Sequence, residues 1–262
     1  MNREELAGLA TQYMGQNLEY YEEIDSTNIR AKAWAREGAK EGSIVIADYQ
    51  NMGKGRLGRV WLSPKGTGIW MSLILRPKLL PREISQITLV AGLSMCQATQ
   101  AITGLDAKIK WPNDIVVNKK KVCGILTEMR VVENTIDYVV VGIGVNVNNQ
   151  TFDETIPYAT SLAIEGKNTY QRELIIKRFA EIFERQYELY NEDGNLKKIL
   201  KEYKANCITL NKEVRILNEQ EEYIAYIEDI DEDGSLIVKK QDGRYETIFS
   251  GEVSVRGLYG YV

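Results

Sequence analysis

Residues 107–130, AKIKWPNDIVVNKKKVCGILTEMR, contain three short apolar runs separated by polar residues: 107–111, 114–118 and 122–130. Runs of this length, rich in isoleucine, valine and leucine, are typical of strands. Lysines 119–121 lie between the second and third runs, and we predict a tight hairpin there. Similar runs lie at 43–49, 68–77 and 137–147. The segment therefore predicts a sheet, and the rest of the chain supplies further strands for it.

Helical spacing and capping residues predict helices around these strands, at 1–16, 23–38, 83–104, 170–191 and 195–206. The second of these begins at Asp25 or Ser26 and ends at Gly38, all preferred cap types. Residues 206–262 hold short strand-like runs with turns such as DEDG, which indicates a small all-β module. We therefore predict an α+β fold, with a mixed-sheet domain over 1–205 and a small β domain over 206–262.

The composition excludes several kinds of chemistry. The 262 residues are 44% hydrophobic and 27% charged, with a formal net charge of −4, as in ordinary globular proteins. No histidine is present, which rules out histidine-based triads, histidine metal sites and imidazole proton shuttles. The three cysteines, Cys96, Cys123 and Cys207, lack CxxC spacing, so we expect no disulfide framework and no zinc site. We find no signal peptide and no membrane span, and expect a cytoplasmic protein.

The stretch GKGRLGRVW at 53–61 combines three glycines with Lys54, Arg56 and Arg59. These cations repel one another unless a negative group lies among them. They belong to a longer stretch, 49–82, that holds seven cations and no carboxylate. We therefore predict that this loop binds an anion, with a solvated basic face as the alternative.

Other families with glycine-rich loops fit this stretch poorly. A dinucleotide-binding loop requires a helix at its third glycine, but RVWLSPKGTG follows here. A protein kinase requires a catalytic histidine motif, and a Walker A loop requires a Gly-Lys-Ser/Thr run; the sequence has neither. Nucleic-acid binding remains open, although the chain is acidic overall and concentrates its cations near one loop.

Several motifs together resemble the signature set of the biotin protein ligases, which attach biotin to a lysine of a carrier protein. They are DSTN (25–28), YQNMGKGRLGRVW (49–61), KWPND (110–114), KKKVCGILTE (119–128) and GIGVNVN (142–148). The resemblance covers about residues 18–165, and SGEVSVRG (250–257) resembles the family's C-terminal module. It implies a catalytic fold like that of class II synthetases and biotinyl/lipoyl ligases, followed by a small SH3-like barrel.

The resemblance also implies a set of site residues. The biotin pocket would hold Ser26, Thr27, Asn28 and Gln50, with helix capping as the alternative role for the first two. The loop residues Gly53, Lys54, Gly55, Arg56 and Arg59 would surround the biotin carboxylate and the ATP phosphates. Trp61 would stack on adenine, unless it is a buried core residue. Ligand-shell positions would be Asn113, Gly124, Asn146 and Lys121.

The implied chemistry has two steps. The biotin carboxylate displaces pyrophosphate at the α-phosphate of ATP and forms biotinyl-AMP, with Mg²⁺ carried by ATP and no metal-ligating side chain predicted. Because this carboxylate is already ionised at neutral pH, no general base is needed, which agrees with the absence of histidine. Lys121 and Arg56 are the expected catalytic cations, although Lys121 has the alternative of a solvated turn lysine. In the second step Asp114 orients or deprotonates the carrier lysine, or else it caps a turn.

The expected partner is the biotin carboxyl carrier domain of a carboxylase; a homodimer is left open. About 20 residues precede the catalytic motifs, too few for a helix-turn-helix domain, so we predict no direct DNA binding. Lys54 stands where the family has arginine, and Asn51-Met52 where it has Thr-Ala, so we expect weaker retention of the adenylate. Two alternatives on the same scaffold are a lipoate–protein ligase and a non-catalytic biotin sensor.

Overall fold

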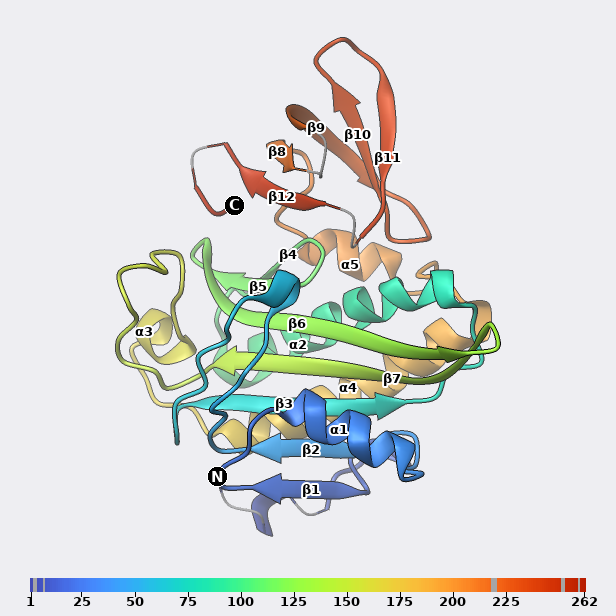
Figure 1. The fold of residues 1–262 in the computed structure, drawn as a ribbon. Coiled ribbons are helices and arrows are strands. Elements are labelled where there is room, and N and C mark those ends of the chain that lie inside the picture. Colours follow the sequence, from blue (N-terminus) through green and yellow to red (C-terminus); the bar gives the residue numbers. More distant parts are fainter. Residues whose placement is uncertain (2–3, 7, 218–220, 251–252, 259) are drawn as a thin grey trace.

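The structure is a computed structural model that describes residues 1, 4–6, 8–217, 221–250, 253–258 and 260–262. A seven-stranded mixed sheet of order β1-β2-β3-β7-β6-β5-β4 forms the larger part (Figure 1). Its strands are β1 (Leu18–Tyr21), β2 (Ile44–Ala47), β3 (Gly68–Leu75), β4 (Lys108–Lys110), β5 (Asp114–Val117), β6 (Lys120–Val132) and β7 (Thr135–Asn146). The pair β1–β2 is parallel, and the other pairs are antiparallel.

Helices cover both faces of this sheet. They are α1 (Thr27–Arg36), α2 (Ile87–Thr103), α3 (Leu162–Gly166), α4 (Arg172–Asp193) and α5 (Leu200–Asn206), with short 3₁₀ segments at Glu4–Leu6, Arg56–Gly58 and Pro81–Gln86. Helix α1 lies on one face, and α2 and α4 lie together on the other (Figure 1). Among the described residues, no helix is both long and apolar enough to cross a membrane.

Side-chain alternation along the strands explains how both faces are filled. In β7, Val139 and Val141 join the main core on the side of α2 and α4, while Tyr138 and Val140 pack with Ala31 of α1 on the other side. Successive strand residues point to opposite faces, so a strand that is apolar at every position buries both of them. All eight residues of β3 are buried for this reason.

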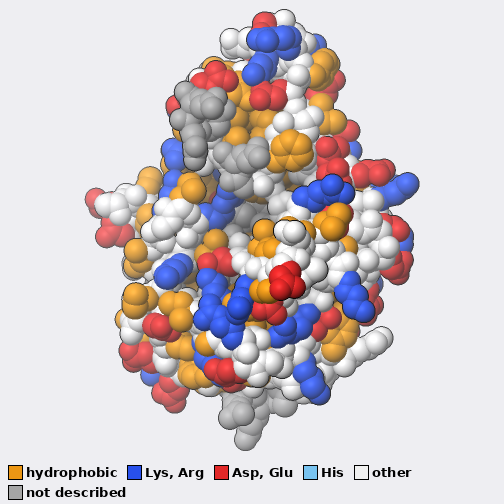
Figure 2. All heavy atoms as spheres, turned by 45° about the vertical axis from the view of Figure 1, so that its right-hand side comes forward, with side chains coloured by type: hydrophobic (Ala, Val, Ile, Leu, Met, Phe, Trp, Pro, Cys, Tyr) orange, Lys and Arg blue, Asp and Glu red, His pale blue; other side chains and the backbone are white. Residues whose placement is uncertain are grey.

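A second, five-stranded antiparallel sheet has the order β11-β10-β9-β8-β12 and forms a narrower lobe on the larger part (Figures 1 and 2). Its strands are β8 (Glu213–Leu217), β9 (Glu222–Ile230), β10 (Leu236–Lys240), β11 (Tyr245–Ile248) and β12 (Ser254–Gly257). The side chains of Lys110, at the end of β4, and of Trp111, which follows it, join the two parts. The Trp111 indole N–H donates to the Gly234 carbonyl at 2.9 Å, and the Lys110 ammonium donates to the Val255 carbonyl at 2.9 Å.

The predicted α+β architecture is confirmed, and so are the predicted strands of both sheets. The predicted helix over 1–16 is wrong: in the described part of this segment only Glu4–Leu6 forms a short 3₁₀ turn. Gly8 and Gly15 have φ values of 72° and 76°, in the left-handed region, which a continuous right-handed helix excludes. Strand β1 was not predicted.

The hairpin between β5 and β6 is also placed differently from the prediction. Its two turn residues are Asn118 and Lys119, with φ values of 48° and 65°, while Val117 pairs with Lys120. Two positive φ values in a two-residue connection are what the twist of an antiparallel hairpin favours. Lys121 therefore lies in β6 and is not a solvated turn residue.

The buried contact of Lys110 makes stability depend on pH. Burial lowers the pKa of its ammonium from 10.5 to about 8, although the Asp114 carboxylate opposes the shift. Between these two pH values the unfolded chain binds more protons at this lysine than the folded chain, so the group's contribution to the free energy of unfolding rises with pH.

We expect the free energy of unfolding of the protein, relative to a Lys110→Met variant, to rise by up to about 3 kcal/mol between pH 7.5 and 10.5. Urea unfolding at a series of pH values measures this difference. Lys108→Met, in the same strand, is the control for the loss of one positive charge. A difference that stays constant or falls with pH contradicts the expectation.

Candidate active site

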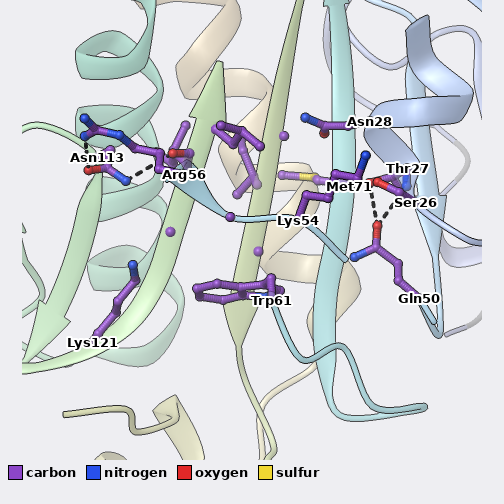
Figure 3. A pocket seen from close by; sticks show the side chains of 17 residues that line it. Ser26, Thr27, Asn28, Gln50, Lys54, Arg56, Trp61, Met71, Asn113 and Lys121 are labelled. Carbon is purple, nitrogen blue, oxygen red and sulfur yellow. Dashed lines mark hydrogen bonds between the residues drawn. The ribbon is translucent and has the colours of Figure 1, made fainter. Parts of the chain in front are cut away.

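The pocket that Figure 3 shows lies on the α1 face of the sheet, where three glycines remove side chains from the strands. Gly142 and Gly144 alternate along β7, and Gly144 pairs with Gly124 of β6. Further along β7 the same face carries Val140, which packs under α1. The apolar layer on this face thus stops where the glycines begin, and a hollow replaces it.

The N-terminus of α1 forms the polar end of the pocket (Figure 3). The Gln50 side-chain oxygen accepts hydrogen bonds from the Thr27 backbone N–H at 2.8 Å and the Thr27 hydroxyl at 3.0 Å, and the Gln50 amide donates to Ser63 at 2.9 Å. Ser26 occupies the N-cap position, but its side chain makes no capping hydrogen bond. Gln50 supplies the acceptor at this helix start, so the Ser26 hydroxyl has no structural partner in the cap.

Asn28 is held by two partners that the sequence did not indicate. The Ser72 hydroxyl of β3 donates to the Asn28 side-chain oxygen at 2.6 Å, and the Asn28 amide donates to Glu128 at 2.8 Å. A side chain at Gly142 would collide with Asn28, so the glycine provides the room for this arrangement. Asn28 therefore has one fixed orientation in the pocket wall.

Cations gather at the opposite end of the pocket. Arg56 donates to the Asn113 side-chain oxygen at 2.8 Å, and burial lowers the pKa of its guanidinium. The Lys121 ammonium lies 2.5 Å from one oxygen of Asp114. Asp114 is 7% exposed and pairs with Gly124, so its side chain lies on the same face of the sheet as the pocket. This end of the pocket suits a ligand with negative charge.

The indole of Trp61 lies against the glycine floor of the pocket. An added Cβ at Gly124 would come within 2.9 Å of the indole ring, and one at Gly144 would collide with the indole nitrogen. The Lys121 ammonium is 5.3 Å from the ring centroid. The indole N–H is buried and has no hydrogen-bond partner among the described residues. Because Trp61 lines the pocket, the alternative of a buried core residue is wrong.

Most of the predicted site residues lie together. Those that line the pocket are Ser26, Thr27, Asn28, Gln50, Lys54, Gly55, Arg56, Trp61, Asn113, Lys121 and Gly124. Four predicted residues do not line it: Gly53, Arg59, Asp114 and Asn146.

These four have other positions in the structure. The Gly53 backbone packs against the Trp61 carbonyl, which leaves no room for a side chain. Arg59 is exposed on the outer part of the loop. Asn146 is buried and donates to the Thr160 carbonyl at 3.1 Å. Asp114 forms an ion pair with Lys121, which lines the pocket.

Sequence reasoning missed several residues of the site: Met71, Ser72, Ile125, Leu126, Glu128, Gly142, Ile143, Gly144 and Tyr261. The alternating glycines of GIGVNVN were the available signal for a hollow on one face of a strand. No local pattern marks Ser72 or Glu128, because their partner lies 44 and 100 residues away in the chain.

The hydrogen bonds of Gln50 predict a measurable effect on small-molecule binding. Gln50→Ala removes the acceptor that fixes the N–H and hydroxyl of Thr27, so the polar end of the pocket is no longer held in one arrangement before the ligand binds. We expect this variant to bind biotin, the ligand that the sequence motifs imply, about 10- to 100-fold more weakly in isothermal titration. Gln150→Ala, which removes an exposed glutamine, is the control. Equal affinities of the two variants would contradict the expectation.

Comparisons with known proteins agree with this geometry. Residues 20–146 match the model of the Biotin/lipoate A/B protein ligase family, and residues 209–256 match that of the Biotin protein ligase C terminal domain. The chain is 40% identical to the bifunctional ligase/repressor BirA of Bacillus spizizenii over 252 residues, which are 95% of this chain and 77% of the relative.

Two further proteins are similar over most of their length. The chain is 30% identical to the biotin–[acetyl-CoA-carboxylase] ligase of Mycobacterium tuberculosis, with 96% of this chain and 92% of the relative covered. The solved biotin protein ligase of Aquifex aeolicus, in complex with biotin and ATP, matches with a TM-score of 0.81 and 32% identity, covering 92% of this chain and 99% of that one. With both domain models matched in order and this identity over nearly the whole chain, the protein belongs to the biotin protein ligase family.

Proposed function

We propose that this protein activates biotin with ATP to biotinyl-5′-AMP, releasing pyrophosphate, and transfers the biotin to a lysine of a biotin carboxyl carrier domain. One observation carries the proposal. A single pocket has neutral hydrogen-bonding groups around Thr27 at one end and the cations Arg56 and Lys121 at the other, and Lys54 is drawn on the side of Thr27 (Figure 3). Biotin has the same polarity, with a neutral ureido ring and a carboxylate tail. The ligases of the family, one of them solved with biotin and ATP, support the same reading.

The polar end suits the ureido ring. The Ser26 hydroxyl, which makes no capping bond, and the fixed amide of Asn28 lie in the same wall. A neutral ring with one carbonyl and two N–H groups requires such a mixture of donors and acceptors. Leu126, which pairs with Gly142 and therefore lies on the same face of the sheet, supplies apolar surface for the rest of the bicyclic ring.

The cationic end suits the reacting groups of the first step. The biotin carboxylate attacks the α-phosphorus of ATP, the bond to the leaving pyrophosphate breaks, and the acyl–phosphate bond forms. Arg56 and Lys121 would neutralise the charge on the phosphoryl oxygens as it builds, so catalysis is mostly positioning and electrostatic stabilisation. Lys54 and Gly55 of the loop would close over the same groups, and Trp61 would stack on the adenine.

Mg²⁺ would enter with the nucleotide in this proposal. The parts of the chain that the structure describes hold no group of three or more carboxylate or cysteine side chains able to bind a metal ion. Magnesium commonly binds enzymes through the phosphates of its substrate and keeps several waters, which is compatible with such a site.

The second step needs an acceptor for a proton. A carrier lysine, with a pKa near 10.4 in water, arrives charged and must lose a proton before its nitrogen attacks the acyl carbon. Asp114, held between Lys121 and Asn113, would accept this proton or orient the amine. The amide bond then forms and AMP leaves.

The test of the proposal is isothermal titration with biotin, followed by titration with biotin plus Mg-ATP while pyrophosphate release is assayed. We expect biotin binding and one equivalent of pyrophosphate per protein. Biotin binding without pyrophosphate would indicate a sensor. Binding of lipoate in place of biotin would move the assignment to lipoate ligation.

A further inference from the structure

Tyr261 brings the far end of the small lobe onto Asp114. Its hydroxyl donates a hydrogen bond to Oδ2 of Asp114. Its ring stacks on Tyr158, with centroids 5.5 Å apart and planes inclined by 26°, and the Lys110 ammonium is 4.4 Å from the ring centroid. Asp114, Tyr158 and Lys110 of the larger part therefore hold the Tyr261 ring in place. Tyr261 lies 147 residues away from Asp114 in the chain.

With this contact, both oxygens of the Asp114 carboxylate have hydrogen-bonding partners. One oxygen forms an ion pair with the Lys121 ammonium at 2.5 Å and accepts a hydrogen bond from the Asn113 amide at 3.2 Å. The other oxygen accepts a hydrogen bond from the Tyr261 hydroxyl. The residue is only 7% exposed. A carrier lysine that has to reach this carboxylate thus finds its second oxygen occupied and its approach covered.

The path of residues 260–262 depends on a glycine of β12. The Val262 backbone packs directly against Gly257, and a Cβ at that position would collide with it. The Gly257 contact and the Tyr261 ring therefore fix the segment at two points. A small cavity lined by Lys110, Val255, Arg256 and Val262 lies beside them.

We propose that residues 260–262 form a gate over Asp114, which closes the path of the acceptor amine until a carrier domain docks. The inference rests on the proposed transfer step. When the gate opens, the charged ammonium of the carrier lysine takes the place of the neutral Tyr261 hydroxyl on Asp114, a stronger, charge-assisted hydrogen bond. While it is closed, the adenylate is protected from small amines that cannot dock.

The test uses ready-made biotinyl-AMP and Nα-acetyl-lysine, a free amine that carries no docking surface. We expect Tyr261→Phe to speed aminolysis of the bound adenylate about 5-fold, the equivalent of one lost hydrogen bond. Gly257→Ala, which displaces the segment but keeps Tyr261, should speed it as well. Tyr245→Phe, an exposed tyrosine of the same lobe, should keep the rate of the unaltered protein.

A second readout compares acceptors. In Tyr261→Phe, the rate of biotin transfer to a carrier domain should rise less than the rate of transfer to Nα-acetyl-lysine. The ratio of these two rates, carrier over free amine, should therefore fall. If aminolysis is unchanged in both gate variants, or falls because Tyr261 positions Asp114 for catalysis, the gate is disproved. Pyrophosphate release from biotin and ATP is assayed separately; its absence in the unaltered protein would disprove the proposed function, not the gate.

Discussion

Lys121→Gln is expected to slow the formation of biotinyl-AMP by about 100- to 1,000-fold. The lysine lies in β6 at the cationic end of the pocket, where its ammonium faces both Trp61 and the Asp114 carboxylate. Glutamine is one bond shorter than lysine and stays polar, but it removes the charge that would stabilise the transferring phosphoryl group. Single-turnover measurement of pyrophosphate release gives the rate of this step.

Lys120→Gln is the matched control for this variant. Neighbouring residues of a strand point to opposite faces, and Lys120 is exposed. The control loses the same charge from the same strand but none from the pocket, so we expect a rate within twofold of the unaltered protein. Equal rates for the two variants would mean that Lys121 acts only as a surface lysine.

Asp114→Asn is expected to slow transfer of biotin from supplied biotinyl-AMP to a carrier by about 100-fold, because asparagine cannot take a proton from the incoming ammonium. The amide is of the same size and keeps one oxygen that accepts hydrogen bonds. Stopped reactions analysed for biotinylated carrier measure the rate. Since the variant also removes the charge that pairs with Lys121, pyrophosphate release is measured beside it.

Asp106→Asn, an exposed aspartate just before β4, controls for the loss of one negative charge. Transfer at the normal rate by Asp114→Asn would rule out proton transfer to this carboxylate. Slowed pyrophosphate release with normal transfer would assign Asp114 to the first step, as the residue that positions Lys121.

The pocket was predictable where its residues lie within short motifs. The turn at Ser26–Asn28, the glycine-rich loop and the segment from Asn113 to Gly124 each carry a local pattern, and the structure brings all three together. The contacts that fix these groups were not predictable. Ser72 on Asn28 and Tyr261 on Asp114 lie far along the chain from the groups that they contact, and nothing in their own neighbourhood identifies those partners.

The errors in the fold have local causes. The helix predicted over 1–16 was inferred from apolar spacing, but Gly8 and Gly15 turn the backbone into the left-handed region. The hairpin turn was predicted at lysines 119–121. Composition could not show that Asn118 and Lys119 are the residues with positive φ values. In both places a backbone angle, which a pattern of hydrophobicity does not encode, decided the structure.

The glycine floor of the pocket has a consequence for how this sequence can vary. Gly124, Gly142 and Gly144 all lie in regular extended strands, where backbone geometry accepts any residue, and none of them has a positive φ. An alanine there would displace Trp61 or Asn28 rather than break the sheet. Alanine at these positions would thus give a folded protein with a filled pocket, so these three glycines serve ligand binding and not folding.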